Sequence, residues 1–198
     1  MIARSRLERA QAAGFIVAGE PLAVDLADTI ITSTDPATDL LCDEATCRLW
    51  WSLQQDRLPE NATTPELAVT VELRRAVREL LDTHVAGTAP NAAAVDYVNA
   101  LAARVTATRR LEHTRAGWTA VTAHHASADR SYEIALGAVT DSLIDLLVGP
   151  SHNRLRRCQN PTCSMLFVAA DARRRFCTQN ICANRTRVAR HYQRHHPG

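Results

Sequence analysis

Four cysteines near the C-terminal end of this chain have the residue type and the spacing that metal chemistry requires. They form two pairs, Cys158 with Cys163 and Cys177 with Cys182, each with four residues inside, and thirteen residues separate the pairs. A structural zinc site takes four such thiolates in a tetrahedron, about 2.3 Å from the metal. Asn and Pro inside the first pair favour a turn that would bring its two sulfurs together. The spacing therefore predicts one structural zinc ion bound by all four cysteines.

The cysteine pattern fits free thiols, disulfides or a catalytic pair less well than it fits zinc. Free buried thiols would be scattered rather than equally spaced, disulfides are rare in the cytoplasm, and catalytic thiol pairs usually have two residues inside. Iron–sulfur ligation stays open, because four cysteines also hold such clusters. A closed zinc site has no position for a catalytic water. Since no set of nucleophile, base and orienting group is readable elsewhere, we expect that the chain is not an enzyme.

The charge of the chain is divided between two segments. The whole chain has a net charge of +2, yet residues 151–198 hold ten arginines and one acid, Asp171, for a net charge of +9. Residues 1–150 have a net charge of −7, and every basic residue of the chain is arginine. Such asymmetry indicates two units with different roles. We expect a helical domain over 1–150 and a zinc module over 151–198 that faces a polyanion.

The residues around the cysteines predict a hairpin followed by a basic helix. Residues 165–168 would run out from the metal and 175–176 would return, while 183–196 contain no Gly or Pro and are typical of a helix. A unit of this size cannot bury enough apolar surface to fold without a metal. The arrangement is treble-clef-like. The arginines expected to contact nucleic-acid phosphates are Arg173, Arg174 and Arg175 at the turn and Arg187, Arg190 and Arg194 on one helix face.

The N-terminal unit reads as all-α with one β-hairpin. After a polar helix over the first 13 residues, ended by Gly14, apolar spacing and capping residues predict five more helices. They would cover 22–31, a segment capped by Asp43 or Asp39 and ending near 58, 64 to about 84 before Gly87, 91–102 and 129–148. Alternating β-branched residues at 105–108 and 118–122 predict the hairpin. Two acids that could form a catalytic pair, Asp25 and Asp28, are interpreted as solvated or capping groups, because no partner for acid–base chemistry accompanies them.

No segment of the sequence predicts a membrane span or a secretory leader. The apolar runs are shorter than the ~20 residues that cross a bilayer, and the first fifteen residues lack an apolar stretch of leader length. We therefore expect a cytoplasmic protein with no membrane partner. The N-terminal unit would sense a signal or form a homodimer, and the sequence does not identify a small-molecule ligand.

The cysteine segment resembles the CGNR zinc-finger family. The resemblance rests on Cys182-Ala183-Asn184-Arg185, on residues 154–163 with the first cysteine pair, and on Leu166-Phe167. Residues 19–26 (GEPLAVDL) with Thr29, and 73–78 (LRRAVR), are similar to the ABATE domain that usually accompanies this finger. Ala183 departs from the family's Gly, and a positive φ at this position would be strained.

The resemblance implies a bacterial transcription regulator that binds DNA. Together with the charge distribution, it gives the function expected here, in which structural zinc fixes a basic helix for contact with DNA phosphates. Two alternatives stay open. The basic module could dock on an acidic protein surface as an adaptor, or it could bind RNA, although RNA binding would favour exposed stacking aromatics.

Overall fold

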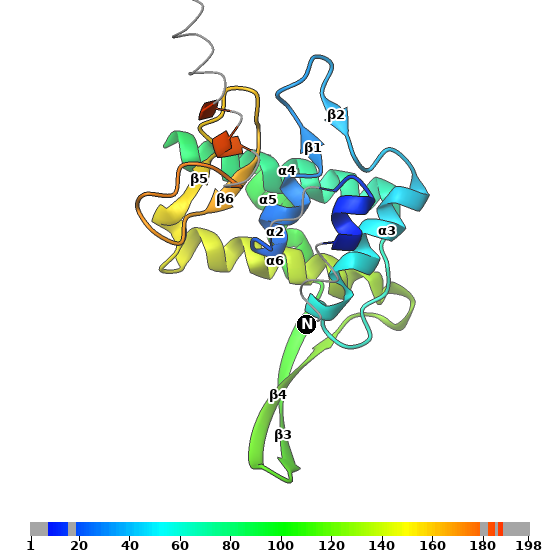
Figure 1. Cartoon of the computed structure of the whole chain (residues 1–198). Coiled ribbons are helices and arrows are strands. Elements are labelled where there is room, and N and C mark those ends of the chain that lie inside the picture. Colours follow the sequence, from blue (N-terminus) through cyan, green and yellow to red (C-terminus); the bar gives the residue numbers. More distant parts are fainter. Residues whose placement is uncertain (1–7, 16–18, 179–181, 185, 188–198) are drawn as a thin grey trace, which may run out of the picture.

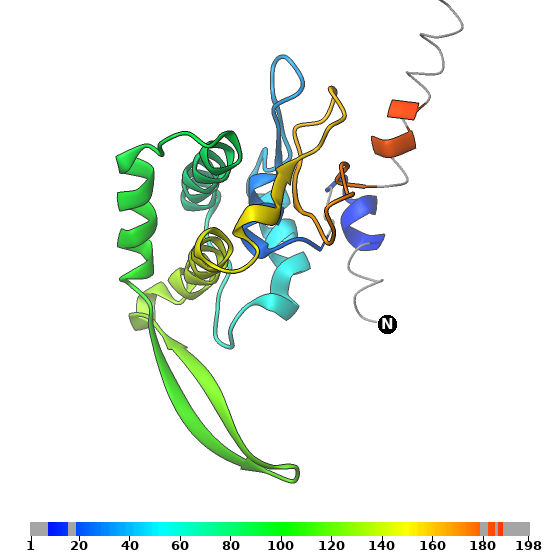
Figure 2. The ribbon, with the colours of Figure 1, turned by 90° about the vertical axis from the view of Figure 1, so that its left-hand side faces the viewer.

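The computed structural model describes residues 8–15, 19–178, 182–184, 186 and 187. Helices form most of the N-terminal unit, as Figures 1 and 2 show, and bounds are defined for five α-helices among the described residues. They are α2 (Leu22–Ala27), α3 (Glu44–Gln54), α4 (Leu67–Ala86), α5 (Ala92–Ala102) and α6 (Tyr132–Val148). Three antiparallel pairs of strands accompany them: β1 (Ile30–Ile31) with β2 (Thr38–Asp39), β3 (Thr106–Thr114) with β4 (Gly117–His125), and β5 (Leu155–Arg157) with β6 (Leu166–Val168).

Capping residues define several helix ends as the sequence predicts. Asp43 begins α3 with a capping box, in which its carboxylate accepts the Thr46 N–H at 2.7 Å and the Thr46 hydroxyl accepts the Asp43 N–H at 3.1 Å. Asn91 caps α5 by accepting the Ala93 N–H at 2.9 Å. Gly87 ends α4 in the left-handed conformation, with φ of 68°.

Helix α2 lies at the centre of the fold. All six of its residues are buried, and it packs against both α4 and α6. The expected helix over 22–31 is wrong in its second half, because α2 stops at Ala27 and Ile30–Ile31 pair with Thr38–Asp39. The Thr29 hydroxyl donates to the Leu26 carbonyl at 2.8 Å, and β-branched isoleucines favour the extended backbone that follows. The N-terminal unit is therefore mainly α, with two strand pairs rather than one.

The long β3–β4 hairpin projects from the helical body (Figures 1 and 2). The sequence predicts this hairpin, and the structure extends each strand to nine residues. Its register places Leu111 opposite Ala120 and His113 opposite Trp118. Among the described elements, β3 and β4 pack mainly on one another.

The strand pairing around the first two cysteines differs from the expectation. Strand β6 pairs with β5, which precedes Cys158, and not with residues 175–176. The chain reverses within the first cysteine pair itself, where the Cys163 N–H donates to the Asn160 carbonyl at 2.9 Å and the Cys158 N–H to the Met165 carbonyl at 2.9 Å. Because this turn brings 155–157 directly beside 166–168, the first pair forms a knuckle at the tip of its own hairpin.

Strand β6 contributes to two apolar cores at once. Leu166 and Val168 pack into the main core of the helical body, which also holds Leu155. Met165, Phe167 and Ala169 point the other way, into a smaller core around the cysteines. Side chains alternate between the two faces of a strand, so a single short strand can serve both cores. One strand thus contributes side chains both to the core of the helical body and to the separate core of the cysteine segment.

Candidate metal centre

The four cysteines come together in the described structure. Their Sγ atoms all lie within 4.8 Å of one another. The separations are 3.8 Å between Cys163 and Cys177 and 3.5 Å between Cys177 and Cys182. Four sulfurs about 2.3 Å from one zinc ion would be about 3.8 Å apart at the edges of the tetrahedron. The donor set and its spacing fit one zinc ion, as predicted.

Each ligand lies at a defined place in the chain. Cys158 follows β5 directly, and Cys163 ends the knuckle just before β6. Cys177 follows the loop 169–176, and Cys182 begins a short helical turn that includes Ala183 and Asn184. Cys158, Cys177 and Cys182 are buried, whereas Cys163 is half-buried. Cys163 is therefore the most exposed of the four sulfur ligands.

The protonation of the cysteine cluster shows why a cation is needed there. Burial raises the pKa of Cys158 to about 11. The hydrogen bond from the Cys177 thiol lowers the pKa of Cys163 to about 5, and donating that bond raises the pKa of Cys177. Cys163 therefore ionises more easily than a free thiol, whereas Cys158 and Cys177 hold their protons more firmly. The four sulfurs would hold a divalent cation as thiolates, and the charge of the cation would replace the protons and offset part of the negative charge.

The Ala183 backbone accommodates the change from the family's Gly. Asn61 is the non-glycine residue with a positive φ in the described part of the chain, so Ala183 does not adopt one. Its methyl group is buried, and its N–H donates to the Thr178 carbonyl at 3.3 Å. The strain that the sequence suggested at this position is absent.

Two carboxylates of the helical body bind the free edge of β6. Asp28 accepts the Leu166 N–H with both oxygens, at 3.0 and 3.1 Å, and Glu20 accepts the Val168 N–H at 2.8 Å. Both acids are buried, at 6% and 7% exposure. Asp28 is therefore not solvated: it lies at the C-terminal cap of α2, and its carboxylate joins the helical body to the hairpin that carries the first cysteine pair.

Arg78 and Asp82 of α4 extend this joint. Arg78 is buried and donates to the Ser164 carbonyl at 2.8 Å, to Asp28 at 3.4 Å and to Asp82 at 2.9 Å. Asp82 in turn accepts from Arg157 of β5 at 2.7 Å. Burial strongly raises the pKa of Asp28, while the Leu166 N–H and Arg78 oppose the increase. Glu20, Asp28, Arg78 and Asp82 thus fix the position of the metal centre on the body.

Arg174 is directed into the protein, unlike the exposed Arg173 and Arg175 beside it. Its guanidinium donates to Glu20 at 2.9 Å and to the carbonyls of Val168 and Cys177 at 3.1 and 2.7 Å. It also lies 4.6 Å from the centre of the Phe167 ring. With its donors directed into the protein, Arg174 holds the loop 169–176 against β6. It is half-buried, and its hydrogen bonds connect the loop to β6 and to the helical body.

The structure describes three of the other five arginines that were predicted to contact phosphates. Arg173, Arg175 and Arg187 are exposed. Arg187 donates to Asn184 at 2.8 Å, within the turn that begins at Cys182. Arg190 and Arg194 lie outside the described residues. The structure therefore positions three of the six predicted arginines at the surface of the zinc module.

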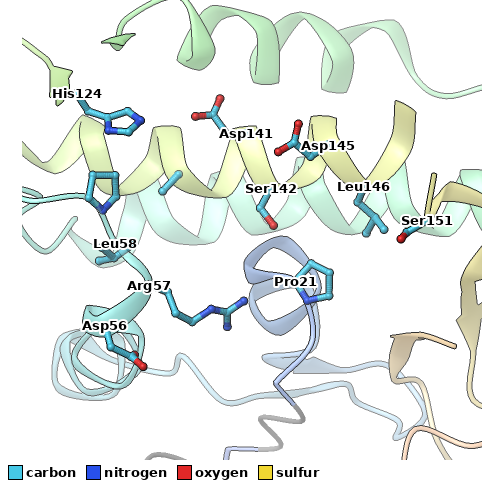
Figure 3. Close-up of a pocket in the computed structure, with 12 residues that line it drawn as sticks. Pro21, Asp56, Arg57, Leu58, His124, Asp141, Ser142, Asp145, Leu146 and Ser151 are labelled. Carbon is cyan, nitrogen blue, oxygen red and sulfur yellow. The ribbon is translucent and has the colours of Figure 1, made fainter. Parts of the chain in front are cut away.

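A separate cavity of about 660 Å³ lies beside α6, near the base of the β3–β4 hairpin (Figure 3). Asp141 and Asp145 of α6, His124 of β4 and Asp56 are among its lining residues. Arg57 also lines it, but pairs with buried Asp25 at 2.6 Å. Burial and the neighbouring Asp145 raise the pKa of Asp141, while His124 opposes the change. This side of the helical body is therefore acidic.

No helix in the described part of the chain has the length and apolar character needed to cross a membrane.

No curated protein matches the sequence. Two family models do. Residues 20–150 match ABATE, whose description reads "Putative stress-induced transcription regulator", and residues 154–195 match the CGNR zinc finger. The chain therefore belongs to the ABATE family and carries a CGNR zinc finger after its helical domain.

Proposed function

We propose that this protein is a DNA-binding transcription regulator whose zinc module holds arginines against the phosphate backbone of duplex DNA. The observation that carries the proposal is the concentration of charge at 151–198, a net charge of +9 beside a helical unit with a net charge of −7. The description of the ABATE family and the CGNR finger support the same function. The protein would act through binding and not through catalysis.

The metal centre would give these arginines a fixed geometry. Exposed Arg173 and Arg175 lie on the loop that Arg174 ties to Glu20, and exposed Arg187 follows Cys182 in the turn that ends the cysteine cluster. Side chains held on a rigid support lose less freedom on binding than those on a free tail. In a treble-clef-like arrangement, the knuckle and the start of the C-terminal helix would share the zinc ion, and the helix would enter or flank a groove.

Salt dependence of binding tests the proposal. We expect the full zinc-loaded chain to bind duplex DNA in fluorescence anisotropy at ~50 mM salt, with affinity falling by about 10³-fold or more at ~200 mM if six or more phosphates are contacted. Duplex RNA serves as the competitor. Failure to bind DNA at the lower salt concentration would refute the proposal and favour an adaptor that docks on acidic protein.

Paired variants separate specific phosphate contacts from general charge. The double variant Arg173→Gln/Arg175→Gln should lower the slope of log affinity against log salt by about 2, since each lost phosphate contact removes about 1. Arg48→Gln/Arg75→Gln removes the same charge from exposed positions of α3 and α4 and should leave the slope unchanged. An equal effect of both pairs would show that only net charge matters.

A further inference from the structure

The β3–β4 hairpin exposes an apolar face that nothing in the described structure covers. Leu111 is 68% exposed and Trp118 is 71% exposed, the latter with the His113 ring 4.7 Å away. The register places Leu111, His113, Trp118 and Ala120 on the same side of the ribbon. An isolated two-stranded ribbon is marginally stable in water. A surface of this kind indicates a protein contact.

We propose that this hairpin is a dimerisation arm, and that its apolar face binds the groove between α4, α5 and α6 of a second copy of the chain. That groove has a volume of about 260 Å³ and is lined mainly by aliphatic side chains, among them Leu80, Val98 and Leu143. Ile144 at its edge is 37% exposed. A cavity of about 150 Å³ accepts benzene, so this groove has room for an indole ring.

The arm cannot place Trp118 in the groove of its own chain. Its nine-residue strands extend about 30 Å, and Trp118 lies close to the turn at the far end. In both views the hairpin runs away from the helices (Figures 1 and 2). The groove that the tip reaches therefore belongs to another molecule. Under a two-fold axis each arm would reach the body of the other copy, giving two equal contacts.

Charge favours a second copy as the occupant. The arm, 106–125, holds three arginines and one acid, for a net charge of +2, whereas the rest of 1–150 has a net charge of −9. A basic arm against an acidic body is complementary, while two arms packed on each other would bring like charges together. The arm also has 20 residues. A standard interface uses about 20–30 residues a side.

Geometry argues against DNA as the occupant. The hairpin projects from the part of the helical body remote from β5 and β6, as both ribbon views show. A duplex bound at the zinc module would therefore not pass along the arm. In addition, Arg110 pairs with Glu112 on the same strand, which reduces the charge available for phosphates. The two surfaces would have separate partners.

Sedimentation velocity on the full zinc-loaded chain over a range of concentrations tests the arm. We expect a dimer for the unmodified chain and about 30-fold weaker association for Trp118→Gln, as for a contact at the centre of an interface. Thr119→Gln is the matched control, since exposed Thr119 lies on the opposite face of the ribbon. Equal association of both variants, or a monomeric wild type, would overturn the proposal.

Variants of the groove test the other half of the contact. Ile144→Gln should weaken association to a similar degree. Leu49→Gln, which removes an aliphatic side chain of comparable exposure on α3, should not. Far-UV circular dichroism with thermal unfolding confirms that each variant is folded. A dimer that survives Ile144→Gln unchanged would refute the groove as the binding site.

Mixing the two defective variants separates arm-to-groove from arm-to-arm contacts. Ile144→Gln keeps an intact arm and Trp118→Gln keeps an intact groove, so the mixture should form heterodimers with one complete contact. Packing between arms predicts no such recovery, and its absence would contradict the proposal.

Acrylamide quenching of tryptophan fluorescence gives a second readout. Trp50 and Trp51 are buried, so the protected fraction should rise with concentration as Trp118 is covered. Protection that instead requires duplex DNA would assign the arm to DNA.

Discussion

Asp28 and Leu166 are joined by two hydrogen bonds across 138 positions of the chain, from one backbone N–H to both oxygens of one carboxylate, at 3.0 and 3.1 Å. The N–H belongs to the edge of β6 that β5 does not pair. An exposed edge strand is a site for unwanted pairing, and covering it with a carboxylate prevents that. The same contact fixes the zinc hairpin on the helical body.

Removing the Asp28 carboxylate should destabilise the joint. Asp28→Ala leaves the Leu166 N–H without its acceptor and takes a partner from buried Arg78. We expect a loss of about 3 kcal/mol in the free energy of unfolding, measured by urea denaturation. Asp96→Ala on the exposed side of α5 should change it by less than about 0.5 kcal/mol. A loss no larger than that of the control would contradict the role of Asp28.

Substitution of Arg174 should lower the stability of the protein much more than substitution of its neighbour Arg173. Arg174→Gln breaks contacts with Glu20 and two carbonyls, so we expect a loss of about 2–3 kcal/mol in unfolding free energy. Arg173 is exposed, and Arg173→Gln should leave unfolding within about 0.5 kcal/mol of wild type. Thermal denaturation of both variants at the same zinc concentration makes the comparison. Equal stability of the two would show that the Arg174 contacts contribute little.

Zinc content should depend on the cluster cysteines alone. Cys177→Ala removes one of four ligands, and we expect the purified variant to lose its zinc, measured by elemental analysis. Cys42→Ala is the control, because Cys42 is an exposed thiol outside the cluster. Chelation of the wild type should lower its Tm by about 10 °C, since zinc binding stabilises the folded state. Full zinc occupancy in Cys177→Ala would refute the four-sulfur site.

Asp39 should make part of the stability dependent on pH. Burial opposes its ionisation, but the Arg74 guanidinium and the Leu41 N–H outweigh burial and lower its pKa. The pair therefore contributes stability above the unfolded pKa of about 3.9, and that contribution is lost as pH falls through the lower folded value. Asp39→Asn should reduce stability by about 1–2 kcal/mol near pH 7, since the half-exposed carboxylate is partly screened. The difference from wild type should shrink as pH falls below the unfolded pKa and through the lower folded one, and a difference that stayed constant with pH would contradict this assignment.

The sequence predicts those features that are set locally. The equal spacing of the cysteines, the caps at Asp43 and Asn91, the end of α4 at Gly87 and the β3–β4 hairpin each depend on a few neighbouring residues. The structure has all of them. Local rules also predict the zinc ion, because four soft ligands in two tight pairs favour that metal.

The sequence does not predict those features that are set by distant contacts. Ile30 and Ile31 continue an apolar helical spacing, yet they form a strand because Thr38–Asp39 pair with them. The residues of β6 pair with β5, which precedes them in the chain, and not with 175–176 as the sequence predicts. Asp28 cannot be distinguished from a surface acid in the sequence, because its partners Leu166 and Arg78 are distant in the chain. The segments 19–26 and 73–78 carry the ABATE resemblance. They supply Glu20 and Arg78 to the contact between the helical body and the zinc hairpin. The resemblance is therefore the one sequence feature that points to these two residues.

Helix α2 separates Glu20 from Asp28, and these two acids bind alternate N–H groups of one strand. N–H groups two residues apart in a strand are about 6.6 Å apart, and α2 must match that distance. Inserting a single residue into α2 would turn Asp28 by about 100° around the helix axis and away from Leu166. The length of this one short helix thus sets the alignment between the helical domain and its zinc finger, and any rearrangement of the domain that tilts α2 would carry the finger with it.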